Sequence, residues 1–153
     1  MRKLLIKSTK LTLIALSMAL LFTSFTANAD DDKRINFNQL PKTAQLFITR
    51  HFSANDIVTA KLDKEITGTI YEVKLKNGTE IDFKKVGTPI KIDCGNNKVP
   101  DSIVGKDILA IIKNLYPATF VKKIKYLKTG TEIELSNGND MIFGKSLKVK
   151  TND

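Results

Sequence analysis

The fold is decided by the stretch YEVKLKNG at residues 71–78. Its apolar side chains Tyr71, Val73 and Leu75 alternate with charged ones, which is the pattern of a β-strand buried on one face. The stretch ends in Asn-Gly, a common turn dipeptide of β-hairpins. Residues 80–84 alternate again after the turn. We therefore expect a hairpin within an antiparallel sheet that has one buried face.

The register of this hairpin follows from which side chains must share the buried face. A two-residue Asn-Gly turn would pair Val73 with Asp82 and so bury the acid. A three-residue turn over residues 76–78, with its glycine in the left-handed conformation, pairs Val73 with Ile81 instead. The sequence therefore predicts the three-residue turn.

The pattern occurs a second time as TEIELSNG at residues 131–138. The same three-residue turn there predicts that Ile133 lies opposite Met141. Upstream and downstream segments also recur in the same order, with small differences in spacing. We expect two tandem copies of one unit, residues 30–95 and residues 96–153.

A helical pattern precedes the strands in each copy. Apolar residues recur at helical spacing in two sets, Leu40, Ala44, Phe47, Ile48 and Phe52, then Val104, Ile108, Ile111, Ile112 and Leu115. Pro41 and Pro100 stand where each helix should start, because the first turn needs no backbone N–H. The predicted fold class is α+β, with two tandem repeats of a helix followed by antiparallel β-strands. The helices would pack on one face of one shared sheet or of two abutting sheets.

Residues 1–29 have the features of a cleavable signal peptide. The first ten residues hold four cations and no acid, and the apolar stretch at 11–25 is shorter than the roughly 20 residues of a membrane span. Ala27 and Ala29 supply the small side chains of a cleavage site. We expect cleavage after Ala29, a periplasmic or secreted location, and no stable membrane insertion afterwards. An uncleaved N-terminal anchor is the alternative.

The charge balance argues against a nucleic-acid partner. Cleavage would remove four cations from the 25 Lys and Arg and leave the 16 Asp and Glu, a formal charge of +5. That excess is modest, and an exported protein does not meet intracellular nucleic acid, so we exclude nucleic-acid binding. Four lysines at 122, 123, 125 and 128 form a cluster. They would meet an anionic lipid or polysaccharide, or protect a sheet edge against aggregation.

No constellation of residues in the mature chain supports catalysis. His51 is the single histidine, so no two-histidine metal site is available, and we interpret it as a surface or capping residue. Cys94 is the single cysteine and has no histidine near it in sequence, so we interpret it as a half-buried structural residue. Neither a G-x-S-x-G motif nor a glycine-rich phosphate loop occurs. We expect no enzyme activity, no cofactor and no metal.

The chain resembles the PepSY-like family of exported bacterial proteins, whose fold is similar to that of the beta-lactamase inhibitor protein. The residues that carry the resemblance are LP at 40–41, FSA at 52–54, YEVKLKNG at 71–78, VG at 86–87, VP at 99–100, YPA at 116–118 and EIELSNG at 132–138. The resemblance implies a binding or regulatory module with helices on one sheet face and a second, open face available for contact.

The outward positions of the predicted strands are the candidate binding face. They are Glu72, Lys74, Glu80, Asp82, Glu132, Glu134 and Asp140, with Lys91, Lys148 and Lys150 beside them. We expect a non-catalytic binding module whose partner is an envelope protein or polymer. The alternative is a small proteinaceous inhibitor of an exported hydrolase, against which the absence of tryptophan weighs, because interface hot spots favour Trp, Tyr and Arg. A low-activity envelope enzyme would need a buried polar cluster that the pattern lacks.

Overall fold

The computed structural model describes residues 33–65, 68–145 and 149–150. The predicted signal peptide, residues 1–29, lies outside the described residues. The described part contains one antiparallel sheet in which the strands follow one another in sequence order. The strands are β1 (Lys33–Arg34), β2 (Ile57–Glu65), β3 (Gly68–Leu75), β4 (Glu80–Lys84), β5 (Pro89–Asp93), β6 (Val121–Leu127), β7 (Gly130–Leu135), β8 (Asp140–Gly144) and β9 (Val149–Lys150).

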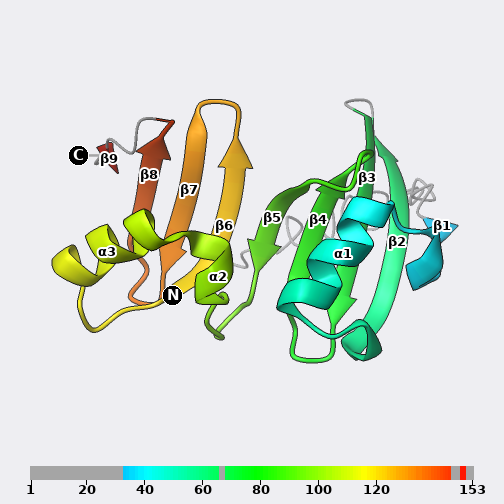
Figure 1. Ribbon diagram of the computed structural model, residues 1–153, viewed down its shortest axis with the longest axis horizontal. Coiled ribbons are helices and arrows are strands. Elements are labelled where there is room, and N and C mark those ends of the chain that lie inside the picture. Colours follow the sequence, from blue (N-terminus) through cyan, green and yellow to red (C-terminus); the bar gives the residue numbers. More distant parts are fainter. Residues whose placement is uncertain (1–32, 66–67, 146–148, 151–153) are drawn as a thin grey trace, which may run out of the picture. The chain divides into compact units, whose positions relative to one another are not determined.

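The helices lie on one face of this sheet, so the predicted α+β class is confirmed. They are α1 (Lys42–His51), α2 (Asp101–Val104) and α3 (Lys106–Leu115), with 3-10 turns η1 (Phe37–Gln39) and η2 (Ala54–Asp56) on either side of α1. Figure 1 shows α1 in front of β2 to β4, with α2 and α3 in front of the second group of strands on the same side. The single sheet decides between the two arrangements expected from the sequence.

The core lies between this layer of helices and the sheet. Ala44 and Ile48 of α1 and Ile112 of α3 are almost completely buried, and all belong to one apolar cluster with the inward side chains of the strands. Phe83 and Phe143 are the largest fully buried side chains. The Phe83 ring packs edge-on against the Phe47 ring of α1, with 5.7 Å between the centroids. Burial of these side chains holds the helices on the sheet.

Both hairpins have the predicted register. Val73 lies opposite Ile81, and Ile133 lies opposite Met141. All four side chains are buried. The turn at residues 76–78 closes with a bond from the Gly78 N–H to the Leu75 carbonyl, 3.0 Å long. Three residues therefore form the turn, because only this length brings the apolar sets together on one face.

The second helix differs from its prediction. α1 begins directly after Pro41, as expected, but Pro100 precedes only the four-residue α2. The chain then turns at Gly105, where φ is +87°, and starts α3. The predicted apolar stripe therefore crosses a break between two helices. Its last member, Leu115, is 53% exposed rather than buried, because it ends α3.

The two halves share backbone details beyond the hairpin register. β2 has a register shift between Ile57 and Thr59 where it pairs with β3, and β6 has one between Val121 and Lys123 where it pairs with β7. Each shift is a β-bulge that adds one residue to its strand and bends it. The closing bond of the first turn recurs from the Gly138 N–H to the Leu135 carbonyl, also at 3.0 Å.

Candidate functional site

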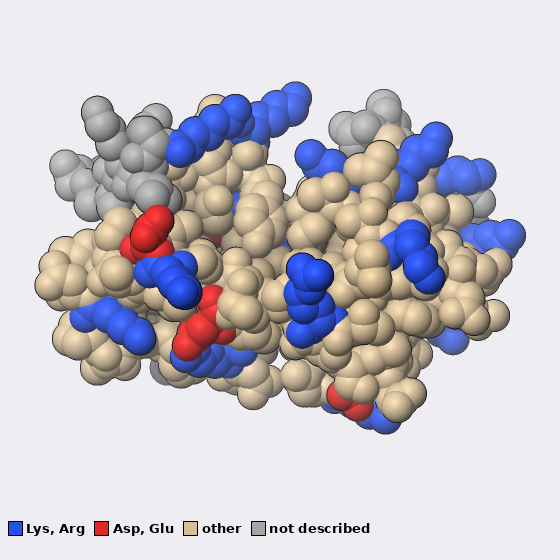
Figure 2. All heavy atoms as spheres, in the orientation of Figure 1, with Lys and Arg blue, Asp and Glu red and all other residues tan. Residues whose placement is uncertain are grey.

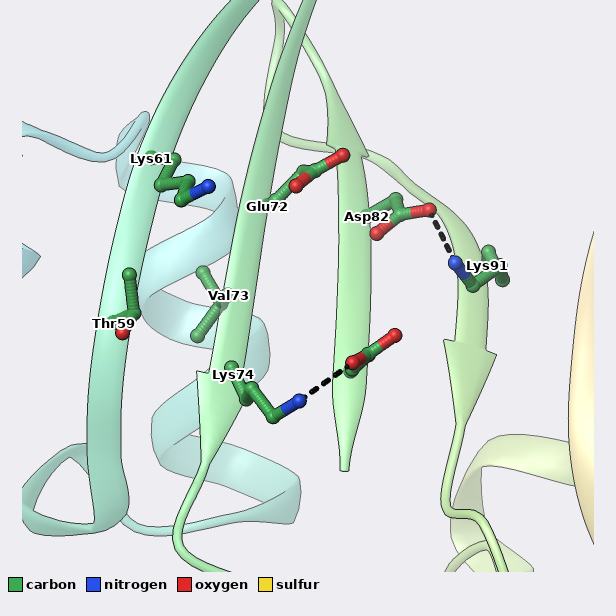
Figure 3. Close-up of a pocket in the computed structure, with 8 residues that line it drawn as sticks. Thr59, Lys61, Glu72, Val73, Lys74, Asp82 and Lys91 are labelled. Atoms are coloured by element: carbon green, nitrogen blue, oxygen red, sulfur yellow. Dashed lines mark hydrogen bonds and ion pairs between the residues drawn. The ribbon is translucent and has the colours of Figure 1, made fainter. Parts of the chain in front are cut away.

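The sheet face opposite the helices carries the predicted binding residues. In β3 and β4 the buried side chains alternate with Glu72, Lys74, Glu80 and Asp82, and α1 lies behind the strands in Figure 3. Glu132, Glu134 and Asp140 occupy the matching positions of β7 and β8. We call this surface the open face.

Antiparallel pairing arranges the open-face side chains in two rows that run across the sheet. The first row contains Thr59, Lys74, Glu80, Asp93, Lys123, Glu134 and Asp140. The second row contains Lys61, Glu72, Asp82, Lys91, Lys125, Glu132 and Ile142. Residues that neighbour each other in a row are direct cross-strand partners, so their side chains are close enough to interact.

Ion pairs connect neighbours along the rows. The distances between ammonium nitrogen and carboxylate oxygen are 2.9 Å for Lys74–Glu80, 3.0 Å for Lys91–Asp82, 2.7 Å for Lys123–Asp93, 3.3 Å for Lys123–Glu134 and 2.9 Å for Lys125–Glu132. The bulge in β6 adds Lys122, whose Nζ is 2.7 Å from Glu134. Opposite charges facing each other across strands stabilise a sheet modestly.

The pairs shift the pKa values of their members in the expected directions. A bond from Lys122 and a further contact with Lys123 lower the pKa of the Glu134 carboxyl. Partial burial acts to raise the pKa of Asp93, but bonds from Lys123 and the Gly95 N–H lower it on balance. The bond to Asp93 raises the pKa of Lys123. Partial burial acts to lower the pKa of Lys91, but Asp82 raises it on balance. These four groups are therefore charged at neutral pH.

The first half of the open face contains a shallow depression of about 250 Å³. Figure 3 shows the side chains that surround it, including the labelled Lys61, Glu72, Lys74, Asp82 and Lys91. Thr59 and Lys61 of β2 were not among the predicted binding residues. Their signal was weak, because the bulge interrupts the alternation of β2. Asp93 was also missed as a member of the first row, although it alternates with Ile92.

The lysine cluster of β6 does not lie at a sheet edge. β6 pairs with β5 on one side and with β7 on the other. Lys122, Lys123 and Lys125 form ion pairs on the open face. The interpretation of these three lysines as edge protection is therefore wrong, because the sequence pattern did not reveal which strands flank the cluster.

Among the described residues, His51 and Cys94 have no contact with each other and therefore do not form a catalytic pair. His51 ends α1, and its Nδ1 lies 3.0 Å from the Ser102 Oγ of α2. Partial burial, with a contribution from Arg50, lowers the pKa of this imidazole. Cys94 is 2% exposed, and burial raises the pKa of its thiol. A buried, protonated thiol is a poor nucleophile.

The described part of the chain offers neither a cluster of metal ligands nor a membrane span. Within residues 33–65, 68–145 and 149–150, no three Asp, Glu, His or Cys side chains are grouped so that they could hold a metal ion. None of the described helices has the length and apolar character that a membrane crossing requires.

The family model for the class described as "Putative beta-lactamase-inhibitor-like, PepSY-like" matches the chain over residues 28–88 and again over residues 69–151. The chain therefore belongs to the PepSY-like family, as its sequence motifs predicted. No protein of curated function matches the chain.

Three solved structures of similar proteins come from Bacteroides. A "putative periplasmic protein" of Bacteroides vulgatus is 36% identical, with a TM-score of 0.76, and the match covers 82% of this chain and 98% of that one. A "putative calcium-regulated periplasmic protein" of Bacteroides thetaiotaomicron is 34% identical over the same shares, with a TM-score of 0.77. A second protein of B. vulgatus, of unknown function, is 31% identical over 78% of this chain and 99% of that one, with a TM-score of 0.71. These periplasmic neighbours confirm the predicted periplasmic or secreted location.

Proposed function

We propose that the mature chain is an exported, non-catalytic binding module whose open face contacts an envelope protein or polymer. One observation carries this proposal: the helices cover one face of the sheet, and the opposite face presents two rows of partly exposed charges. Lys74 and Glu80, for example, have side chains that are 56% and 47% exposed.

The charge pattern of the open face indicates what kind of partner would fit. Most cations in the rows already have an acid at 2.7 to 3.3 Å, so the face has mixed charge rather than one sign. Complementary charges mainly give specificity and register, whereas desolvation of an existing pair has a cost. A partner would therefore present alternating charges of its own and would bind with moderate affinity.

We also propose that the mature chain is two copies of one unit, residues 30–95 and residues 96–153, behind a cleaved signal peptide of residues 1–29. The matching bulges in β2 and β6 support this proposal, as do the matching turns at Gly78 and Gly138. Two copies side by side would double the length of the open face. Mass spectrometry of the exported protein would detect an N-terminus at Asp30.

A small inhibitor of an exported hydrolase is the second candidate function. The beta-lactamase-inhibitor-like description of the family favours it. The composition of the open face weighs against it, because its two rows contain no aromatic side chain among the described residues and the sequence has no tryptophan. Titration of the mature chain against a purified beta-lactamase tests this candidate. Stoichiometric inhibition would favour it over a general binding module.

The calcium regulation named for the B. thetaiotaomicron protein is not part of the proposal for this chain. The acids around the depression of the open face include two that pair with lysines: Glu80 pairs with Lys74, and Asp82 pairs with Lys91. These ammonium groups compete with a cation for the same carboxylates. We therefore expect calcium to leave the melting temperature of the mature chain unchanged.

Site-specific photo-crosslinking in the native envelope tests the proposed binding face. A photoreactive residue at Glu80 or Glu132 samples the open face, and one at Thr49 or Lys113 samples exposed positions of the helices. We expect the same crosslinked partner from both open-face positions and none from the helix positions. Equal crosslinking from the two surfaces, or none from the open face, would contradict the proposal.

A further inference from the structure

One end of the sheet gathers lysines from successive hairpins. In an antiparallel sheet whose strands follow in sequence order, every second turn lies at the same end. The C-terminal ends of β2, β4, β6 and β8 therefore share one end of the sheet, which is uppermost in Figure 1. This end carries Lys64, Lys84, Lys85, Lys128 and Lys145, which we call the lysine edge. Figure 2 shows blue side chains along it.

The lysine edge differs from the open face in its ion pairing. On the open face, a carboxylate oxygen lies within 3.3 Å of the ammonium nitrogen of five lysines: Lys74, Lys91, Lys122, Lys123 and Lys125. Each of the five lysines of the lysine edge, in contrast, forms no ion pair with a described residue. Their charge is therefore available to a partner.

Apolar side chains are exposed next to these lysines. Val86 follows Lys85 in the β4–β5 turn and is 67% exposed. Leu127 precedes Lys128 at the end of β6 and is 40% exposed. Exposed Val and Leu at the tips of hairpins leave apolar surface in water, and a partner that covers this surface gains the free energy of its burial.

An open groove connects the two hairpins. The β5–β6 ladder ends at the pair Lys91 and Lys125. Beyond this point the strands leave a groove of about 560 Å³, lined by Lys84, Thr88, Pro89, Ile90, Tyr126, Leu127 and Lys128. A second, smaller groove next to it shares Lys84 and Ile90 and continues to Ile70 of β3. Lysines and apolar side chains thus line these grooves together.

The opposite end of the sheet provides a contrast within the same molecule. Its turns contain mainly asparagine and glycine, as in Asn77-Gly78 and Asn137-Gly138. Two lysines next to these turns have acidic partners: Lys76 lies 3.6 Å from Asp56, and Lys98 lies 2.8 Å from Asp101. The lysines next to these turns are thus paired with acids, whereas those of the lysine edge are not.

We propose that the lysine edge docks on a membrane surface that contains anionic phospholipid. Lysines near such a surface are attracted to the headgroups, each by an amount that corresponds to about a fivefold gain in affinity. Val86 and Leu127 enter the interfacial layer, where apolar side chains next to cations bind most favourably. The open face stays perpendicular to the membrane and free for its own partner. This docking is peripheral and needs no membrane span.

The arrangement favours a membrane over a soluble acidic protein or polymer as the occupant. The lysines lie at or next to the ends of four strands along a whole end of the sheet, so they fit a broad surface rather than a compact site. A soluble polyanion would use the lysines but not the exposed Val86 and Leu127. The contribution of these two side chains therefore distinguishes the two kinds of partner.

Vesicle co-sedimentation of the mature chain, residues 30–153, tests the proposal. This fragment contains every described helix and strand. The probes are vesicles of phosphatidylcholine alone and of phosphatidylcholine with an equal part of phosphatidylglycerol. We expect binding to the anionic vesicles, weakened by salt, and none to the neutral ones. Absence of binding to anionic vesicles would overturn the proposal while leaving the open-face proposal intact.

Two matched variants locate the surface. The first is Lys84→Gln/Lys85→Gln/Lys128→Gln, and the second is Lys76→Gln/Lys98→Gln/Lys113→Gln, which removes the same charge elsewhere. We expect the first to lose roughly a hundredfold in vesicle affinity and the second much less. Equal losses would show that net charge alone attracts the chain and would overturn the assignment to this edge.

A third variant, Val86→Ser/Leu127→Ser, separates membrane docking from polyanion binding. It keeps every lysine, and both side chains are exposed, so the fold should persist. We expect weaker binding to anionic vesicles and unchanged binding to soluble heparin. Unchanged vesicle binding by this variant would show that the edge recognises polyanions rather than a membrane, and would overturn the proposal.

Discussion

Val73 lies directly opposite Ile81 in the ladder between β3 and β4, and both side chains are at most 1% exposed. This pairing depends on the turn that joins the strands. In that turn Gly78 has a φ of +85°, a left-handed conformation that a residue with a Cβ adopts only at a cost. One glycine thus sets which side chains of the hairpin face the core.

The first prediction compares Gly78 with a second glycine of positive φ, Gly87 in the β4–β5 turn, where φ is +83°. Gly78→Ala should reduce the free energy of unfolding by about 1 kcal/mol, from backbone strain alone, since a Cβ there meets open space. Gly87→Ala should cost more, because its Cβ would lie 2.7 Å from the Ala44 backbone nitrogen of α1.

Urea denaturation of the two variants measures this difference. Gly78→Val should be at least as destabilising as Gly78→Ala, because β-branched residues tolerate positive φ least. Equal unfolding free energies for Gly78→Ala and Gly87→Ala would contradict the contact between the β4–β5 turn and α1. An unchanged midpoint for Gly78→Val would contradict the strained turn itself.

The hairpins could be predicted from sequence because their alternation is regular on both strands. Only one turn length then places the apolar side chains of both strands on the same face. The structure has the register that this turn length predicts, with Val73 opposite Ile81 and Ile133 opposite Met141. The start of α1 was also predictable, since Pro41 marks it. Features that interrupt a period were not: the chain breaks its second helix at Gly105, and the bulges shift the register of β2 and β6.

The sequence allowed us to predict which charged residues share the open face, but not which of them form ion pairs. Glu132 and Glu134 had to point away from the core, since Ile133 between them is buried. Their partners Lys125 and Lys123 lie on the preceding strand, and their match depends on a bulge that no local pattern indicates. The same limit led to the wrong interpretation of the β6 lysines as protection of a sheet edge.

The second prediction concerns a buried hydroxyl. Thr79 is 0% exposed, and its Oγ1 has no hydrogen-bond partner of ordinary geometry among the described residues. The Cys94 thiol adjoins it, but a thiol is a weak partner. Thr79→Val should therefore leave the unfolding free energy unchanged or raise it by up to about 1 kcal/mol, because the buried polar group disappears at nearly constant shape.

Thr119→Val is the matched control for this prediction. The Thr119 hydroxyl donates a hydrogen bond to the Tyr116 carbonyl at 2.9 Å, so this substitution should cost about 1 kcal/mol. Thermal melts followed by circular dichroism compare the two. A loss of stability in Thr79→Val as large as that in Thr119→Val would show that the Thr79 hydroxyl is satisfied in solution.

The third prediction is a dependence of stability on acid pH. Asp93 and Glu134 both contact Lys123, and the pKa of each carboxyl lies below its ordinary value of 3.8 or 4.5. A carboxyl whose pKa is lowered by folding adds stability that is fully present above the ordinary value and disappears as the pH falls through the lowered one. The free energy of unfolding should therefore fall as the pH decreases below about 4.5.

The variant Asp93→Asn/Glu134→Gln isolates this contribution. It is expected to be less stable than the wild-type chain at neutral pH but to lose less stability between neutral pH and pH 3. Urea titrations at both pH values give the two differences. If the variant and the wild-type chain lost the same stability on acidification, other groups would be responsible and the pairing with Lys123 would not contribute.

The fourth prediction concerns the pair formed by Lys125 and Glu132, with 2.9 Å between Nζ and Oε1. Lys125 also lies opposite Lys91 on β5, where the two halves of the sheet meet. Lys125→Glu should place two acids opposite each other across β6 and β7, and Glu132→Lys should place two cations there. Glu132→Lys alone should reduce the free energy of unfolding by about 0.2–1 kcal/mol, the range for partly exposed pairs, and Lys125→Glu should reduce it less, because its carboxylate also lies opposite Lys91.

The exchanged variant Lys125→Glu/Glu132→Lys should recover most of this loss, because it restores opposite charges across the ladder. The exchange also places a carboxylate opposite Lys91, where the wild-type chain has two lysines facing each other. Relief of this like-charge contact should bring the exchanged variant close to the wild-type stability. A double-mutant cycle in low salt measures the coupling directly. Additive losses, with zero coupling energy, would show that these charges are merely solvated and do not order the open face.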